Sequence, residues 1–140
     1  MTNTLELKII TPDRIVYDGT GISSITIPTK EGEITVLPGH IPLIAPIKTG
    51  EARLIKEGVT LGLAVSGGIL EVRADNTIVI LAERGELAHD IDVARAEDAY
   101  ERAKLAMKME MNVADVDFAK IQSALEKELN RINIGKKWRK

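Results

Sequence analysis

Three prolines at four-residue spacing, Pro38, Pro42 and Pro46, constrain the fold of this chain more than any other feature. Each proline ring fixes φ and removes a backbone hydrogen-bond donor, so residues 31–46 cannot form a helix or an ordinary central strand. Aliphatic side chains fill the positions between the prolines, which predicts a bend pinned onto a hydrophobic core. Within this bend Pro38-Gly39 is typical of a tight turn, and His40 follows directly.

The first part of the chain alternates apolar and polar residues in short runs, which is typical of half-buried strands. These runs cover residues 5–9, 14–17, 22–27, 51–56, 59–66, 69–73 and 77–82. Asp18-Gly19 is predicted to end a strand, and Gly67-Gly68 to form a bulge or a hairpin turn in preference to a phosphate site. Short strands with frequent turn signals predict an N-terminal β-sandwich, or flattened barrel, over residues 1–86.

The pattern changes to a helical period near residue 90. Residues 93–111 contain neither Gly nor Pro, and Asp92 before them is a typical N-cap. Small side chains form one face of this helix: Ala96, Ala99, Ala103 and Ala106 or Met107. After a break at residues 112–117, a second helix begins at the cap Asp117, ends at Gly135 and carries Phe118, Ile121, Leu125, Leu129 and Ile132 on one face. Residues 87–140 are therefore predicted to form an antiparallel two-helix hairpin.

Composition excludes several classes of protein. The chain has no cysteine, which rules out disulfides and thiolate metal sites, and its two histidines cannot alone form a catalytic metal set. No apolar run approaches the roughly 20 residues that span a bilayer, and the first residues lack a signal-peptide pattern. We expect a soluble, intracellular protein without membrane insertion.

Residues 120–140 carry seven basic and two acidic side chains, which indicates either an anionic partner or a solvated helix end.

Motifs of catalysis and of nucleic-acid binding are absent. No phosphate-binding loop, dinucleotide fingerprint or nucleophile elbow occurs in the sequence. Residues 1–86 have an acidic balance and no basic stripe with interleaved aromatic residues, so we expect no nucleic acid among the partners. Because a nucleophile, a base and an oxyanion donor cannot be assembled from these residues, an enzyme is the least favoured class.

Three blocks of sequence resemble one family in order and spacing. They are VLPGHIPLIAPIKTG (residues 36–50), AVSGGILEV (residues 64–72) and DIDVARAEDAYERA (residues 90–103). Together they resemble the ε subunit of bacterial F-type ATP synthases over essentially the whole chain. The alternative is a generic β-sandwich interaction module with a helical tail, which explains none of the three blocks.

The resemblance implies a non-catalytic subunit of the central stalk, peripheral on the cytoplasmic face of the cell membrane. Its β domain would contact the γ subunit and the c-subunit ring, with Glu31 and His40 facing the ring. Its hairpin would either fold back or extend toward the catalytic α and β subunits and inhibit ATP hydrolysis. Arg131, Lys136 and Lys137 would then meet acidic loops of the β subunits, where complementary charge sets orientation.

The resemblance also implies ATP as a regulatory ligand. Many bacterial ε subunits bind ATP through an I/L-D-x-x-R-A motif, which here spans Ile91, Asp92, Arg95 and Ala96. Arg102, Lys127 and Arg131 match further binding positions, although Lys127 replaces an arginine and so loses a bidentate fork. The implied acidic ligand is Glu86, with Glu83 as the alternative. The simpler interpretation is that Asp92 only caps the helix and Arg95 is a surface residue.

Overall fold

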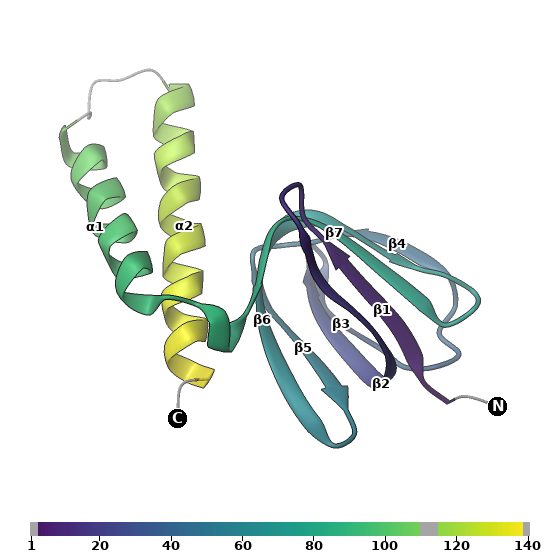
Figure 1. Ribbon diagram of the computed structural model, residues 1–140. Coiled ribbons are helices and arrows are strands. Elements are labelled where there is room, and N and C mark those ends of the chain that lie inside the picture. Colours follow the sequence, from purple (N-terminus) through teal and green to yellow (C-terminus); the bar gives the residue numbers. More distant parts are fainter. Residues whose placement is uncertain (1–2, 110–114, 139–140) are drawn as a thin grey trace. The chain divides into compact units, whose positions relative to one another are not determined.

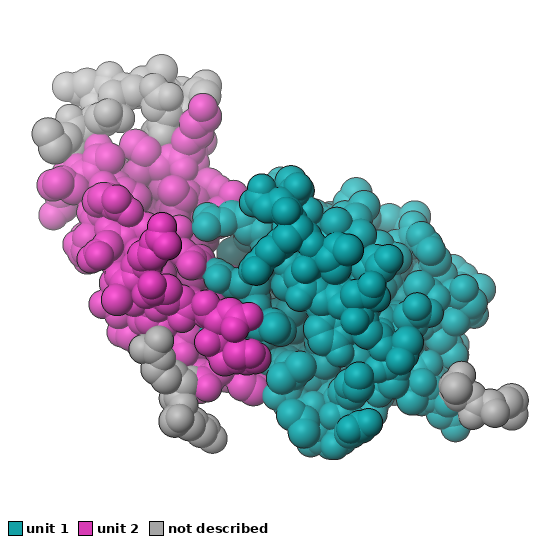
Figure 2. Space-filling model, in the orientation of Figure 1, with its two compact units in different colours: residues 1–88 teal, residues 89–140 magenta. Residues whose placement is uncertain are grey.

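The computed structural model describes residues 3–109 and 115–138 and divides into two compact units. The β domain is Met1–Ala88 and the helical hairpin is His89–Lys140. Figure 2 colours the two units separately. This division falls two residues after the predicted boundary at residue 86.

The β domain contains all the strands, and the hairpin contains both long helices (Figure 1). The strands are β1 (Leu5–Ile10), β2 (Ile15–Thr29), β3 (Gly32–Val36), β4 (Leu43–Pro46), β5 (Gly50–Lys56), β6 (Val59–Val72) and β7 (Thr77–Leu87). A short 3-10 turn, η1 (Ala88–Asp90), precedes α1 (Val93–Met109) and α2 (Asp115–Trp138). No helix in the described residues is long and apolar enough to cross a membrane.

The strands close on themselves around one aliphatic core. Strand β1 pairs antiparallel with β2 and parallel with β7, and the order β1-β7-β6-β5-β2 completes a ring. Strand β3 extends the sheet beyond β2, and β4 pairs with β6. Fully buried Ile and Leu side chains from β1, β2, β5, β6 and β7 fill the interior. This flattened barrel, followed by two helices, confirms the predicted fold class.

Strand β2 is one continuous strand, although Asp18-Gly19 predicts a turn. Asp18 pairs with Lys8 and Gly19 pairs with Leu7 on β1, so long-range pairing overrides the local turn signal. The irregularity lies further along, where Gly21 has φ of 74° and β2 passes from β1 to β5 and β3. One long bent strand thereby contributes to both layers of the barrel.

Strand β6 is also continuous, and the predicted bulge or hairpin turn at Gly67-Gly68 is wrong. Ser66 pairs with Arg84 and Gly68 pairs with Ala82, so the register with β7 is the same on both sides of Gly67. The two glycines have φ of 65° and 115° and bend the strand where its other neighbour changes from β5 to β4. A glycine corner of this kind marks a bend in a closed sheet.

The proline-rich segment holds two short strands, β3 and β4, joined by the predicted turn. The His40 amide donates to the Leu37 carbonyl at 3.1 Å, and Gly39 has φ of 87°. Pro38 followed by a glycine with positive φ is typical of a type II turn. The Gly39 amide also donates to Asn76 Oδ1 at 2.8 Å, which ties this turn to the β6–β7 connection. As expected, neither proline-flanked strand is central in the sheet.

Helix α1 begins as its sequence predicts. The Arg95 amide donates to Asp92 Oδ1 at 3.1 Å, and the Ala96 amide donates to the Asp92 carbonyl at 3.0 Å. Asp92 is therefore the N-cap. The small-residue face is buried or half-buried and includes Ala96, Ala99, Ala103, Ala106 and Met107.

Helix α2 differs from its prediction in three places. The helix already includes residues 115–117, so Asp117 is not its N-cap. The break was predicted at residues 112–117, and its first part, residues 112–114, lies outside the described residues. Gly135 does not end the helix, because α2 continues to Trp138. A Cβ atom at Gly135 would lie 2.6 Å from Val93 Cγ2, so glycine allows α2 to pack closely on the start of α1. Leu129 is exposed, and Glu128 is buried instead.

Candidate functional site

An exposed apolar row crosses the outer face of the β domain. Pro46 on β4, Ile69 on β6, Leu81 on β7 and Ile10 on β1 are directly opposed in consecutive strands. Ile69 is 49% exposed and Leu81 is 52% exposed. Scattered exposed aliphatic side chains are normal, but a row across four strands is a contiguous patch of the kind that binds a partner.

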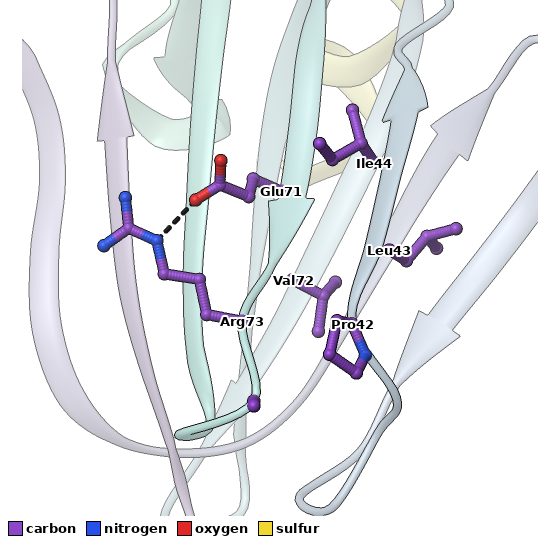
Figure 3. A pocket seen from close by; sticks show the side chains of 7 residues that line it. Pro42, Leu43, Ile44, Glu71, Val72 and Arg73 are labelled. Atoms are coloured by element: carbon purple, nitrogen blue, oxygen red, sulfur yellow. Dashed lines mark hydrogen bonds and ion pairs between the residues drawn. The ribbon is translucent and has the colours of Figure 1, made fainter.

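A groove of about 540 Å³ lies where β4 pairs with the end of β6 (Figure 3). Pro42, Leu43 and Ile44 line one side, and residues 71–74 line the other. Glu71 forms an ion pair with Arg73 at the groove. The hydrogen bond that Arg73 Nε donates to the Glu71 carboxylate raises the pKa of Arg73, so the guanidinium stays charged. The groove therefore combines an apolar wall with a neutral pair of opposite charges.

Glu31 and His40 lie on exposed connections of the β domain. The Glu31 amide donates to Thr29 Oγ1 at 3.2 Å in the β2–β3 turn, which leaves the Glu31 carboxylate at the surface. His40 Nδ1 lies 2.6 Å from the Ile41 carbonyl oxygen, so Nδ1 carries the proton and Nε2 remains available to a partner. Glu31 is exposed and His40 is half-buried.

Two arginines of the implied nucleotide site share one pocket on α1. Arg95 and Arg102 line a pocket of about 520 Å³ together with Asp98 and Glu101. The four residues recur at helical spacing on one face of α1. Two carboxylates balance the two guanidinium groups, so a phosphate entering this pocket would meet two acidic side chains as well as two donors.

The apolar residues of the I-D-x-x-R-A motif are structural. Ile91 and Ala96 are buried, and Ile91 Cγ2 lies beside Gly135 of α2. Asp92 is exposed and caps α1. Ile91 therefore packs against α2, Asp92 caps α1, and Ala96 is part of the buried face of the hairpin.

The remaining implied ligands lie on α2 and in the β domain. Lys127 and Arg131 are half-buried on α2 and are not among the residues that line the Arg95 pocket. Glu86 is half-buried on β7, where it pairs with Ala64. Glu83, the alternative, lies over Gly67, since a Cβ atom there would be 2.7 Å from its carboxyl group.

The basic residues near the end of α2 have partners within the hairpin. Arg131 Nη1 lies 2.8 Å from Glu128 Oε2, and Lys136 Nζ lies 3.5 Å from Glu97 Oε1. Lys137 Nζ lies 5.8 Å from the centre of the Trp138 ring. In the part of the chain that the structure describes, no cluster of three or more His, Cys, Asp or Glu side chains could hold a metal ion.

The sequence analysis did not predict two features: the apolar row of the β domain and the buried Glu128 of α2. The apolar row was readable in β7, because Val79 and Leu81 are apolar at positions whose neighbours Ile78 and Ile80 fill the core. The burial of Glu128 carried no such signal, since a glutamate in a helix is ordinarily at the surface.

Comparison with known protein families gives two matches that follow one another along the chain. Residues 4–88 match the model of the ATP synthase delta/epsilon chain β-sandwich domain. Residues 89–136 match the model of the long α-helix domain of the same chain.

Full-length relatives agree with these matches. The ATP synthase epsilon chain of Halalkalibacterium halodurans is 43% identical over 132 residues, which cover 94% of this chain and 96% of the relative. That of Bacillus subtilis is 41% identical over 134 residues, covering 96% and 98%.

Solved structures share the fold at low sequence identity. A chain of the Euglena gracilis mitochondrial ATP synthase aligns with a TM-score of 0.75 and 22% identity, covering 93% of this chain and 80% of that one. A chain from the central stalk and c-ring structure of the Tetrahymena thermophila enzyme aligns with a TM-score of 0.58 and 19% identity, covering 95% and 94%. The family matches, the relatives and the fold agree, and the chain belongs to the ATP synthase delta/epsilon chain family.

Proposed function

We propose that this chain is the ε subunit of an F-type ATP synthase: a non-catalytic part of the central stalk that helps to couple proton translocation to ATP synthesis. The observation that carries the proposal is the likeness to chains named ATP synthase epsilon chain, which extends over 94% or more of this chain at 41–43% identity. As a peripheral subunit it would lie at the cytoplasmic face of the membrane.

The exposed surfaces of the β domain fit two partners in such a stalk. The apolar row of Pro46, Ile69, Leu81 and Ile10 is assigned to the γ subunit, since a permanent interface has an apolar centre. The exposed connections that carry Glu31 and His40 are assigned to the polar loops of the c-subunit ring. A generic interaction module would lack affinity for γ, so co-purification with γ distinguishes the two.

The hairpin is assigned an inhibitory role toward the catalytic subunits. It is a separate compact unit whose helices meet through small residues, including Gly135 and Ala96, and such a narrow contact stabilises it little. Extended toward the catalytic head, it would bring the basic side chains of Arg131, Lys136 and Lys137 to acidic loops of the β subunits. Separating the two helices would first require breaking the pair between Lys136 of α2 and Glu97 of α1.

Deleting residues 89–140 is expected to raise ATP hydrolysis by the reassembled enzyme at least about fivefold, in the range of ordinary coupling between sites. The β domain, with its closed barrel, should still assemble with γ. Hydrolysis would be measured on purified reconstituted enzyme with equal ε content. Unchanged hydrolysis with full assembly would eliminate the inhibitory role and leave the stalk role standing.

ATP is proposed to hold the hairpin in its folded form. The support is the adjacency of Arg95 and Arg102 in one pocket, with Arg131 on the partner helix. Substitution of Arg95 by alanine is expected to weaken ATP binding about tenfold, because a hydrogen bond from a charged group is lost. Isothermal titration calorimetry on the isolated chain measures this. Equal affinity in Arg95→Ala and the wild type would exclude Arg95 as a ligand.

A further inference from the structure

Glu128 is a carboxylate in the apolar stripe of α2. It lies one helical turn from Ala124 and Leu125 on one side and from Ile132 on the other. Ile132 is buried, Ala124 and Leu125 are half-buried, and the Glu128 side chain is only 10% exposed. A carboxylate is rarely buried in this way unless a positive partner compensates its lost hydration.

Arg131 is that partner. Its Nη1 atom donates to Glu128 Oε2 at 2.8 Å, and its side chain is 19% exposed. The Lys136–Glu97 pair is longer, at 3.5 Å, and far more exposed to water. Because solvent screens the Glu128–Arg131 pair less, it constrains Arg131 more strongly than a surface pair would.

This pair bears directly on the nucleotide site proposed above. We propose that Glu128 is a built-in competitor of phosphate for Arg131, so that it lowers the affinity of the folded hairpin for ATP while stabilising the empty hairpin. A phosphate that takes Arg131 must either displace the Glu128 carboxylate or bind beside it. Displacement costs the ion pair, and binding beside it places two negative charges within a few ångströms. The inference rests on the proposed role of ATP as a ligand.

The same residue is expected to act in opposite directions on the two states of the hairpin. Without nucleotide, Glu128 neutralises Arg131, which shares a helix face with Lys127 one turn away. With nucleotide, the phosphates supply the negative charge and Glu128 becomes repulsive. A purely structural role for Glu128 would instead affect both states in the same direction.

The test is ATP binding by the full chain, measured by calorimetry, for the wild type, Glu128→Gln and the control Glu126→Gln. The control removes a carboxylate from an exposed position on the same helix. Glu128→Gln is expected to bind ATP about tenfold more tightly, and the control to match the wild type. Thermal unfolding followed by circular dichroism should show Glu128→Gln less stable than the wild type without ATP and more stable with saturating ATP.

A double mutant shows whether the effect passes through Arg131. In an Arg131→Ala background, Glu128→Gln should bring no gain in ATP affinity. Unchanged or weaker ATP binding by Glu128→Gln, in a chain whose binding is weakened by Arg95→Ala, would overturn this inference and leave the ATP site intact. Absence of ATP binding in the wild type and in Glu128→Gln alike would overturn the ATP site and the inference together.

Discussion

Replacing Gly68 by alanine is expected to destabilise the β domain by at least about 4 kcal/mol, in the range of the largest single substitutions. The new Cβ atom would lie 2.0 Å from the Leu81 carbonyl oxygen and 2.7 Å from Ala82 Cα, both on β7. These are backbone atoms of a paired strand, so the clash is relieved only by separating β6 from β7. Native-state hydrogen exchange of the β6 and β7 amides measures the loss.

Gly32 provides the matched control for this substitution. Its φ of 117° is nearly the same as the 115° of Gly68, but nothing lies within 4 Å of the position of a Cβ atom there. Gly32→Ala therefore introduces the backbone strain without the clash and is expected to cost about 2 kcal/mol. A similar loss of stability in both variants would mean that the sheet adapts to a methyl group at Gly68. The close approach of β6 and β7 would then not be the reason for glycine at this position.

Substituting Leu81 by aspartate is expected to weaken binding to the γ subunit about hundredfold, as loss of a central apolar contact does in an interface. Leu81 lies between Ile69 and Ile10 in the apolar row, so a carboxylate there would lose its hydration when γ covers the row. Because the side chain points outward, the core stays filled and the variant should fold. Surface plasmon resonance with purified γ measures the affinity.

Val59→Asp is the control for the γ interface. Val59 is 58% exposed, comparable with Leu81 at 52%, but it lies at the β5–β6 turn and pairs with Lys56, outside the row. The control should bind γ with wild-type affinity. Equal weakening in the two variants would point to a general effect of added charge, and undiminished binding by Leu81→Asp would move the γ interface to another face.

Local chemistry in the sequence predicted the elements whose cause is local. The Pro38-Gly39 turn follows from a proline ring and a glycine that tolerates positive φ, and both are present in the structure. Asp92 caps α1 because its carboxylate reaches the Arg95 amide three residues away. The three blocks of sequence also identified the family, which the comparisons confirmed.

Long-range contacts decided the rest of the fold. Asp18-Gly19 and Gly67-Gly68 are turn signals that the structure places inside continuous strands, because pairing with β1 and β7 outweighs local preference. Gly135 predicts a helix end, but α2 continues through it to Trp138. Glycine stands there because a side chain would clash with Val93 of α1.

The candidate site divides in the same way. The sequence by itself determined which residue types are available: the arginines of α1 and α2, the acidic and histidine side chains of the exposed connections, and a small-residue seam between the helices. Only the tertiary structure decided which of them meet. The alignment of Ile69 with Leu81 and Ile10 depends on strand register, and the burial of Glu128 depends on helix packing. The meeting of Glu128 with Arg131 is local, since residues three apart on a helix are neighbours. Strand register and helix packing join groups that are far apart in the chain, and no local pattern specifies them.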